Sequence, residues 1–286
     1  ALLGPQRMPI DPDSVGYQTP PIEFSYDWRD TVKYALSVGA SPDAELDYLY
    51  EGRGPKVLPT FCTIPTFAAF DALVDRIGCD RSGMVHRSQE ARLYKTIPPS
   101  GELVVTGRVE GVYDLKRMAT ALFVVHAHDP SGDRVFRGEV GLVLLKDGGF
   151  GGPRPPRSER VMIPERPPDF ETRERVPETQ ALLYRLNGDY NPLHADPDFA
   201  SRVGFERPIL HGLCTFGYVG RAALRRGFGG DPDRFRALRA QFSSPVFPGD
   251  TLIVQGWNEG DRLILSAATA ARLDEPCITQ AFAIAG

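Results

Sequence analysis

The sequence contains few cysteines, and none of them is arranged as a metal-binding or disulfide motif. Its 286 residues include four, Cys62, Cys79, Cys214 and Cys277, with apolar neighbours and no CxxC pair. Structural zinc sites and disulfide frameworks depend on such spacings, so neither is indicated. We therefore expect buried thiols, no bound metal and a reducing compartment.

Long hydrophobic runs and an excess of positive charge are also missing. Nowhere do about 18 apolar residues follow one another, as a membrane-spanning helix requires, and no basic leader opens the chain. The 33 basic and 37 acidic residues give a formal net charge of −4. Because nucleic-acid binding needs a surplus of Lys and Arg, we expect neither nucleic acid nor a membrane as a partner.

The composition is that of a globular protein with a sizeable core. With 42% hydrophobic and 24% charged residues, a chain of this length is expected to form two domains or one large α+β unit. Residues 147–157 read DGGFGGPRPPR, a Gly- and Pro-rich cluster that suits a linker. No GK[ST] follows these glycines, so a phosphate-binding loop is not indicated. Residues 1–7 precede Met8 and are left out of the fold prediction as a short extension.

A weak internal repeat relates the two sides of this linker. YALSVGA (34–40) matches YRLNGDY (184–190), VLPTFCT (57–63) matches ILHGLCT (209–215), and IPPSGELVVTGRV (97–109) matches PVFPGDTLIVQGW (245–257). The three blocks keep the same order at a nearly constant offset, which indicates a duplicated domain. We predict an N-terminal repeat over 8–147, a linker over 148–160 and a C-terminal repeat over 161–286.

Each repeat combines one apolar helical segment with alternating segments that read as antiparallel strands. The helical segments are 61–77 and 213–224, and the predicted strands are 102–112, 119–128, 136–145, 236–246, 251–257 and 262–270. A helix that is apolar nearly all round must be enclosed, and Gly217 and Gly220 would let a sheet approach it closely. This pattern predicts an α+β double hot-dog fold, in which two repeats of a curved antiparallel sheet each wrap a helix.

The second repeat carries a stiff polar loop that reads GDYNPLH over residues 188–194. Gly188 permits backbone angles closed to other residues, and Pro192 fixes its own φ and favours extended geometry at Asn191. We interpret Asp189 and His194 as an acid–base pair acting on one water or substrate proton, with Asn191 orienting the water or a partner. The alternative is that the Asx side chains only brace a turn.

Two helix starts flank the predicted chemistry. Asp196 followed by Pro197 is typical of an N-cap with proline at the first helical position. A second helix is predicted to begin at Gly212, where its free backbone N–H groups could donate hydrogen bonds to a thioester oxygen. The neighbouring His211 we interpret as a structural histidine that satisfies the backbone.

At this point the sequence resembles the (R)-specific enoyl-CoA hydratases, or hydratase 2, of the MaoC-like dehydratase family. The likeness is greatest to the hydratase 2 region of peroxisomal multifunctional enzyme type 2 and extends from about Met8 onward. It is carried by DGGFGGPRPP, PERPPD, ALLYRLNGDYNPLHADPDFA, GFERPILHGLCTFG and SSPVFPGDTL, with a weaker match along HRSQEARLYKTIPPSGEL.

The resemblance implies reversible syn hydration of trans-2-enoyl-CoA to (3R)-3-hydroxyacyl-CoA, in fatty-acyl or related side-chain β-oxidation, without a cofactor. It implies catalytic roles for Asp189, His194, Asn191 and the backbone of Gly212. It places the acyl-CoA substrate against His86, Arg87, Lys116, Tyr190, Pro192, Leu193 and Phe242. Where the family commonly has glycine after His86, this sequence has Arg87.

Further residues are expected to serve the two ends of the substrate. Because coenzyme A is a polyanion, cationic side chains suit its phosphates; the candidates are Lys116, Arg117, Arg234, Arg236 and Arg239. The first repeat lacks the Asp–His pair, and by analogy with the family it makes room for the acyl tail. Its series Phe61, Ile64, Phe67, Phe70 and Leu73 either lines that room or is ordinary core.

Two other functions remain open from the sequence: a hot-dog acyl-CoA thioesterase and a non-catalytic acyl-CoA binding protein. Residues 207–230 contain no Asp or Glu, whereas many thioesterases of this fold place a carboxylate on the enclosed helix. A binding protein would not need both Asp189 and His194. The C-terminal AFAIAG is not a peroxisomal signal, so a bacterial cytoplasmic protein is expected, with the peroxisome as the alternative in a eukaryote, and a homodimer is the expected assembly.

Overall fold

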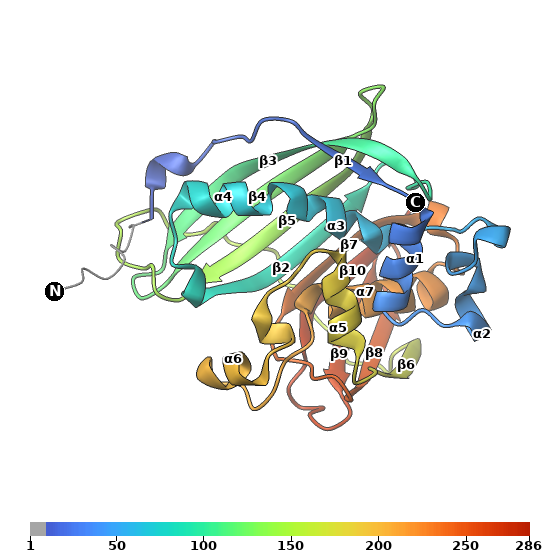
Figure 1. Cartoon of the computed structure of the whole chain (residues 1–286). Coiled ribbons are helices and arrows are strands. Elements are labelled where there is room, and N and C mark those ends of the chain that lie inside the picture. Colours follow the sequence, from blue (N-terminus) through green and yellow to red (C-terminus); the bar gives the residue numbers. More distant parts are fainter. Residues whose placement is uncertain (1–9) are drawn as a thin grey trace.

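The computed structural model describes residues 10–286, so residues 8 and 9 of the predicted first repeat lie outside the described part. These residues form one curved, ten-stranded antiparallel sheet with helices on its concave side (Figure 1). The strands are β1 (Ile22–Tyr26), β2 (Met84–Leu93), β3 (Gly101–Asp114), β4 (Ala119–His128), β5 (Arg134–Leu144), β6 (Phe170–Arg175), β7 (Phe235–Phe242), β8 (Thr251–Asn258), β9 (Leu263–Thr269) and β10 (Ile278–Ala285).

Within residues 10–286, seven α-helical segments accompany the sheet. They are α1 (Trp28–Ser37), α2 (Pro42–Glu45), α3 (Thr63–Thr66), α4 (Phe70–Ile77), α5 (Gln180–Tyr184), α6 (Pro197–Arg202) and α7 (Gly212–Ala222). Short 3₁₀ turns join several of them, and a π-helical turn over Ala223–Gly227 extends α7. In the described part of the chain, no helix has the length and apolar character needed to cross a bilayer.

The order of the strands shows the duplication. Read inward from its two edges, the sheet runs β1, β3, β4, β5, β2 on one side and β6, β8, β9, β10, β7 on the other. Each strand of the first half therefore has a counterpart in the second. The halves meet where β2 pairs with β7, from Ser88 opposite Gln241 to Arg92 opposite Ala237. The two predicted curved sheets are thus present, but they are joined into one.

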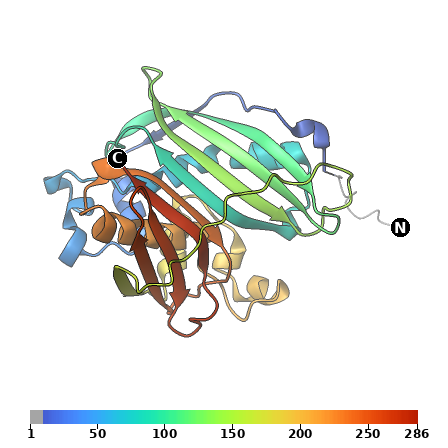
Figure 2. The ribbon, with the colours of Figure 1, turned by 180° about the vertical axis from the view of Figure 1, so that it is seen from behind.

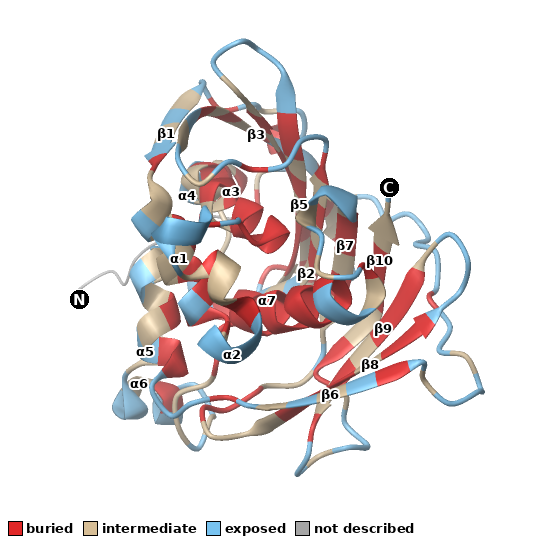
Figure 3. Ribbon diagram, turned by 90° about the vertical axis from the view of Figure 1, so that its right-hand side faces the viewer, coloured by how far each residue is buried: buried red, intermediate tan, exposed pale blue. Residues whose placement is uncertain are grey.

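The second predicted helix is α7, which begins at Gly212 as expected. All ten of its residues from Leu213 to Ala222 are buried, and Figure 3 shows it enclosed between the sheet and the outer helices. A Cβ atom on Gly217 would lie 2.4 Å from Cγ1 of Val38, and one on Gly220 would lie 2.5 Å from Cγ2 of Thr60. Gly217 therefore admits the helical layer of the first repeat, whereas Gly220 admits both that layer and the sheet, since its Cβ would lie 3.4 Å from Cδ2 of Leu238 in β7.

The first predicted helix, over residues 61–77, is helical from end to end but changes between 3₁₀ and α turns. The chain forms a 3₁₀ turn (Pro59–Cys62), α3, a second 3₁₀ turn (Phe67–Ala69) and then α4. Pro65 lies within α3, where it has no backbone N–H to donate to a helical hydrogen bond. The predicted helical segment is therefore present in irregular form, but it is enclosed less completely than α7, because Asp71, Ala72 and Asp75 are exposed.

The Gly- and Pro-rich segment after β5 is irregular and crosses the outer face of the sheet to β6 (Figure 2). It is attached at both ends by hydrogen bonds. The carboxylate of Asp114 accepts N–H groups of Gly149 and Gly151 at 2.9 and 2.7 Å, and the Val161 N–H donates to Oε1 of Gln280 at 2.8 Å. The two repeats are therefore connected by a fixed strap along the back of the sheet.

All four cysteines are free. Cys62, Cys214 and Cys277 are buried as expected, whereas Cys79 is only partly buried. Burial raises the pKa of all four thiols above the ordinary value for cysteine. The thiols are therefore protonated at neutral pH, as packed side chains rather than nucleophiles.

Candidate active site

The loop between α5 and α6 holds its polar residues by a series of local hydrogen bonds. Gly188, with φ of +119°, ends the turn that follows α5. Oδ1 of Asp189 accepts the Asn191 N–H at 3.2 Å, and Oδ1 of Asn191 accepts the Leu193 N–H at 3.0 Å. Both Asx side chains therefore brace the loop. The second oxygen of the Asp189 carboxylate is left for other partners.

Asp196 begins the next helix in the manner predicted. Its side chain accepts the N–H groups of Asp198 and Phe199 at 2.9 and 3.3 Å, with Pro197 at the first helical position. His194 ends the short 3₁₀ turn before this cap. The imidazole is consequently held between two fixed backbone segments.

His194 is largely buried, with 9% of its surface exposed. Its Nδ1 lies 2.9 Å from the carbonyl oxygen of Ile209, and a carbonyl only accepts, so Nδ1 carries the proton and Nε2 is the basic nitrogen. Burial lowers the pKa of His194 below its usual value, although the Asp189 carboxylate and the Ile209 carbonyl oppose this shift. His194 is therefore a neutral base at neutral pH.

The structure brings Asp189 and His194 together and adds His211 to them. One ligand atom from each of the three residues lies within 4.8 Å of the other two. By distance these side chains could hold a metal ion. However, the imidazoles of His194 and His211 are stacked, with centroids 3.7 Å apart and planes inclined by 27°. In-plane nitrogen lone pairs of stacked rings point nearly parallel rather than toward a common ion, so the arrangement suits proton transfer better than metal binding.

The amino end of α7 faces the same space. The first intrahelical hydrogen bond of α7 runs from the Cys214 N–H to the His211 carbonyl at 3.1 Å, so the N–H groups of Gly212 and Leu213 precede the ladder. A Cβ atom on Gly212 would lie 3.3 Å from the ring of Phe242. The ring of Phe242 in turn contacts that of His86 at 4.9 Å between centroids. These two aromatic rings therefore form the wall opposite the helix end.

These groups line a cavity of about 390 Å³. It contains the predicted residues Asp189, Asn191, His194, Gly212, His86, Leu193 and Phe242. Its remaining wall is mostly apolar and comes from both repeats: Phe67, Phe70, Met84, Val85, Leu142, Phe205, Ile209, Leu210, Leu213, Thr215, Ser243, Ser244, Pro245, Val246 and Cys277. Asp189 is the one carboxylate among the residues that line it.

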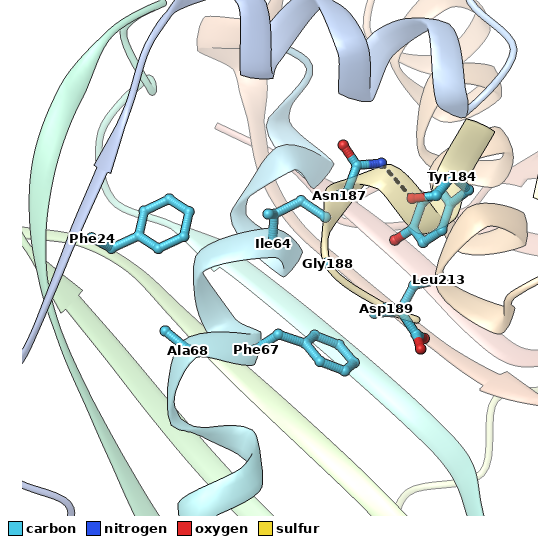
Figure 4. A pocket seen from close by; sticks show the side chains of 9 residues that line it. All are labelled: Phe24, Ile64, Phe67, Ala68, Tyr184, Asn187, Gly188, Asp189 and Leu213. Atoms are coloured by element: carbon cyan, nitrogen blue, oxygen red, sulfur yellow. Dashed lines mark hydrogen bonds between the residues drawn. The ribbon is translucent and has the colours of Figure 1, made fainter. Parts of the chain in front are cut away.

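A second cavity of about 210 Å³ lies on the other side of Asp189 (Figure 4). It is lined by Phe24, Ile64, Phe67, Ala68, Tyr184, Asn187, Gly188, Asp189 and Leu213. The two cavities share Phe67, Asp189 and Leu213. Within the predicted apolar series, Ile64, Phe67 and Phe70 line cavities, whereas Phe61 and Leu73 are fully buried core.

The other predicted substrate residues do not line either cavity. Arg87 donates from Nη1 to the Phe242 carbonyl at 2.9 Å, Tyr190 is 61% exposed beneath Arg185, and Pro192 shapes the loop. Lys116 occupies the β3–β4 turn with φ of +73°. The same holds for the predicted phosphate partners Arg117, Arg234, Arg236 and Arg239.

His211 and Tyr184 lie beside the predicted pair. The sequence indicated only that His211 would satisfy the backbone, and its Nε2 does lie 3.2 Å from the Asp189 carbonyl oxygen. The ring of Tyr184 lies 4.8 Å from that of His211, which in turn covers His194. His211 and His194 are 17 positions apart, and no spacing rule connects them. The glycine that follows His211 and marks the start of α7 was the nearest available signal.

Comparisons with known proteins agree with the sequence resemblance. A family model described as "MaoC like domain" matches residues 160–273, and one described as "MFE-2 hydratase 2 N-terminal domain" matches residues 24–145. The chain is 38% identical to mouse peroxisomal multifunctional enzyme type 2 over 87% of its own length and 35% of that protein. It is 37% identical to enoyl-CoA hydratase ChsH3 of Mycobacterium tuberculosis over 93% of its own length and 95% of that protein. The chain thus spans about a third of the former and nearly all of the latter.

Solved structures agree as well. A MaoC-like dehydratase from Phytophthora capsici superimposes with a TM-score of 0.86 and 27% identity, over 97% of this chain and 98% of that one. A Mycobacterium tuberculosis protein described as a double hot-dog fold gives a TM-score of 0.59 at 14% identity, over 96% of this chain and 97% of that one. The second likeness concerns the fold alone and confirms the predicted double hot-dog architecture.

Proposed function

The chain belongs to the hydratase 2 group of the MaoC-like dehydratases, and from this premise we propose that Asp189 and His194 catalyse the reversible syn hydration of trans-2-enoyl-CoA to (3R)-3-hydroxyacyl-CoA. The observation that supports the proposal most directly is one cavity holding the Asp189 carboxylate, the basic Nε2 of His194 and the free N–H groups at the start of α7. Hydration of a conjugated thioester needs a base, a positioned water and a donor for the developing enolate oxygen.

The roles follow from the hydrogen-bonding capacity of each group. The Gly212 N–H donates to the thioester oxygen, where negative charge develops; such a donor contributes about 10²–10³ in rate. Asp189 and His194 hold a water against C3, and Nε2 of His194 accepts a proton as the C3–O bond forms. A proton then reaches C2 on the same face, directly from His194 or through Asp189. Water is thereby added across the double bond, and the pair returns to its starting state.

The two cavities suggest how the substrate lies. Gly212 and His194 line only the larger cavity, whereas Asp189 lines both. With the thioester at Gly212 and C3 at Asp189, the acyl tail continues past Asp189 into the smaller cavity between Ile64 and Phe67. The remainder of the coenzyme A leaves through the larger cavity beside Phe242 and His86.

The test of this function compares two carboxylate variants with crotonyl-CoA as substrate. Asp189→Asn keeps an Oδ1 acceptor for the Asn191 N–H, so the loop remains braced, but the amide cannot act as an acid or base. We expect hydration to fall by about 10² or more. The matched control is Asp198→Asn, an exposed residue of α6 that lines neither cavity; its rate should equal that of the parent protein.

The assay follows loss of the conjugated thioester, the configuration of the product and free thiol in parallel, with a metal chelator present. An (S)-product would contradict the assigned stereochemistry. Release of thiol would instead favour a thioesterase. If neither the conjugated thioester is lost nor thiol is released, a binding protein is favoured. Asp189 is the one carboxylate among the residues that line the larger cavity, and α7 carries no carboxylate. Many thioesterases of this fold have a carboxylate on the corresponding helix, so this arrangement argues for hydration.

We also infer that the protein needs no cofactor, works in the bacterial cytoplasm and pairs as a homodimer. An acid–base pair and a backbone donor suffice for hydration, so activity should survive dialysis against the chelator. The likeness to ChsH3 of Mycobacterium tuberculosis supports a bacterial protein. Light scattering of the pure protein would measure its mass and contradict the dimer if it gave a monomer.

A further inference from the structure

His211 contacts every part of the proposed catalytic machinery. Its ring stacks on that of His194 at 3.7 Å, its Nε2 lies 3.2 Å from the backbone carbonyl oxygen of Asp189, and it directly precedes Gly212. On its other side the ring contacts Tyr184. With 1% of its surface exposed, His211 is fixed between the loop that carries the pair and the helix that carries the N–H donor.

The hydrogen bonds of His211 determine its protonation. The Asp189 carbonyl can only accept, so Nε2 carries the proton and donates it. Nδ1 is then a lone-pair nitrogen, and it is buried with no hydrogen-bond partner among residues 10–286. A proton on Nδ1 would therefore create a buried cation without an acceptor, directly against His194. Burial and the neighbouring His194 accordingly lower the pKa of His211 to about 2.

We propose that His211 is a positioning residue that sets the geometry of Asp189 and His194 relative to the start of α7 while remaining uncharged throughout the reaction. Its donor fixes the backbone of Asp189, and its ring face fixes the plane of His194 and keeps water from one side of it. When His194 accepts a proton, the neutral ring beside it adds no repulsion. Because a displacement of about 1 Å can cost 10²-fold in rate, the loss of either contact should lower kcat.

The charged and titratable groups around this stack are few. Asp189 faces His194 from the loop, Tyr184 faces His211 from α5, and Arg185 disfavours a positive charge on His211. The stack therefore contains one group that titrates during the reaction, His194, beside one that does not. An effect of His211 on His194 is expected to act through solvent exclusion rather than through its own charge.

Two substitutions separate the two contacts. His211→Phe keeps a ring face but has no N–H for the Asp189 carbonyl, so kcat should fall about 10- to 100-fold with KM for crotonyl-CoA within about twofold. The acid limb of its pH profile should stay in place. His211→Gln keeps a donor near the position of Nε2 but has no ring. Water then reaches His194 and burial lowers the pKa of His194 less, so the acid limb should move to higher pH.

The control is His128→Gln, on β4 in the first repeat and outside both cavities. Its kcat and pH profile should match those of the parent protein. If both His211 variants fold and retain the parent kcat and pH profile, His211 is a packing residue and the proposal is overturned. A lower melting temperature with unchanged kinetics would overturn it in the same way.

A measurement on the unmodified protein covers the case in which the variants fail to fold. The chain has five histidines, so ¹⁵N spectra can assign each ring. We expect an Nε2–H tautomer for His211 that persists as the pH is lowered to about 5, and an Nδ1–H tautomer for His194. A titrating His211 would refute the proposal. The kinetic tests of the His211 variants rest on the proposed hydratase function, whereas the measurement of the tautomers does not. If the parent protein is inactive on crotonyl-CoA, the hydratase function is refuted, and the tautomer of His211 still tests its proposed uncharged state.

Discussion

At the scale of single residues, one hydrogen bond decides how His194 can act. The Ile209 carbonyl fixes the proton on Nδ1, so Nε2 is presented as a base without assistance from a carboxylate. Asp189 is then free to hold water or a proton rather than to orient the imidazole. This differs from triads in which a carboxylate binds the ring nitrogen, and it explains why both groups face the same cavity.

The pH dependence of hydration follows from the neutral form of His194. Because burial lowers its pKa below the ordinary 6.5, the base remains unprotonated as the pH falls through 6.5. We expect kcat/KM for hydration to be level around pH 6.5 and to decline only at lower pH, when His194 gains its proton. Initial rates measured from pH 8 to pH 5, with circular dichroism at each pH to confirm folding, would check this. A decline centred above 6.5 would contradict a desolvated base.

The sequence was sufficient to predict that Asp189, Asn191 and His194 lie together, as they do in the lining of one cavity, because their loop is short and Gly188 and Pro192 mark it. It was not sufficient for His211, whose importance arises from stacking on a residue 17 positions away. Arg87 and Lys116 show the opposite case. The family resemblance placed both against the substrate, yet Arg87 donates a hydrogen bond to the Phe242 carbonyl and Lys116 lies in a turn outside both cavities.

At the scale of elements, the helix boundaries with strong local signals were predicted correctly. The Asp196–Pro197 cap and the Gly212 start are both observed. Strands β3, β4, β5, β7, β8 and β9 also match, since long alternating runs identify them. Strands β1, β2, β6 and β10 were not predicted; β6, for example, is a charged edge strand that reads FETRER. Segment 59–77 is helical, as its apolar spacing indicated, but its alternation between 3₁₀ and α turns was not predicted.

The helical segment 59–77 offers a test of the smaller cavity. Ala68 lies in the 3₁₀ turn between α3 and α4, and it lines the smaller cavity but not the larger one. In Ala68→Leu the larger side chain should fill the space for the tail but leave the reacting carbons undisturbed. We expect kcat/KM for a twelve-carbon enoyl-CoA to fall about tenfold or more, since each methylene in an apolar pocket is worth about 1–3 kcal/mol.

Crotonyl-CoA serves as the internal standard for this variant, and its kcat/KM should change by less than about twofold. The matched control is Ala270→Leu, an exposed position after β9. Equal losses for the short and long substrates would show that the tail does not enter this cavity.

At the scale of the whole molecule, a buried ionic cluster joins the two repeats. Arg221 of α7, 1% exposed, donates from Nε to Oε1 of Glu45 in α2 at 2.9 Å and from Nη2 to the other oxygen of Glu45. Its Nη1 donates to the Val38 carbonyl at 2.9 Å and to Glu174 of β6 at 2.8 Å. Helix α7, whose amino end faces the proposed catalytic site, is thus fixed near its carboxyl end to the first repeat.

Removing one partner should cost more than removing two. Arg221→Met leaves the buried Glu45 with only the longer 3.7 Å ion pair to Arg225, and we expect the free energy of unfolding to fall by about 3–5 kcal/mol. In the double variant Arg221→Met/Glu45→Met this poorly compensated carboxylate is gone, and Arg225 keeps its 3.5 Å ion pair with Glu174, so the loss should be smaller. Urea unfolding of the three proteins measures both values. A double variant less stable than the single one would contradict this account.

The sequence repeat predicted two similar units but not their union into one sheet. That union depends on the pairing of β2 with β7, whose edges carry no local signal for a partner more than a hundred residues away. For the same reason the sequence could not reveal that residues of both repeats line the larger cavity. Long-range pairing becomes visible only when the units are placed side by side.

The position of Asp189 at the border of two cavities has a consequence for how such an enzyme diversifies. The smaller cavity takes Phe24, Ile64 and Ala68 from the first repeat, whereas Phe67, Asp189 and Leu213 border both cavities. On the proposed placement of the acyl tail, substitutions at Phe24, Ile64 or Ala68 would change which substrates are accepted and leave Asp189 and His194 in place. The duplicated half that lacks the Asp–His pair would then supply positions at which selection alters selectivity without altering the reaction.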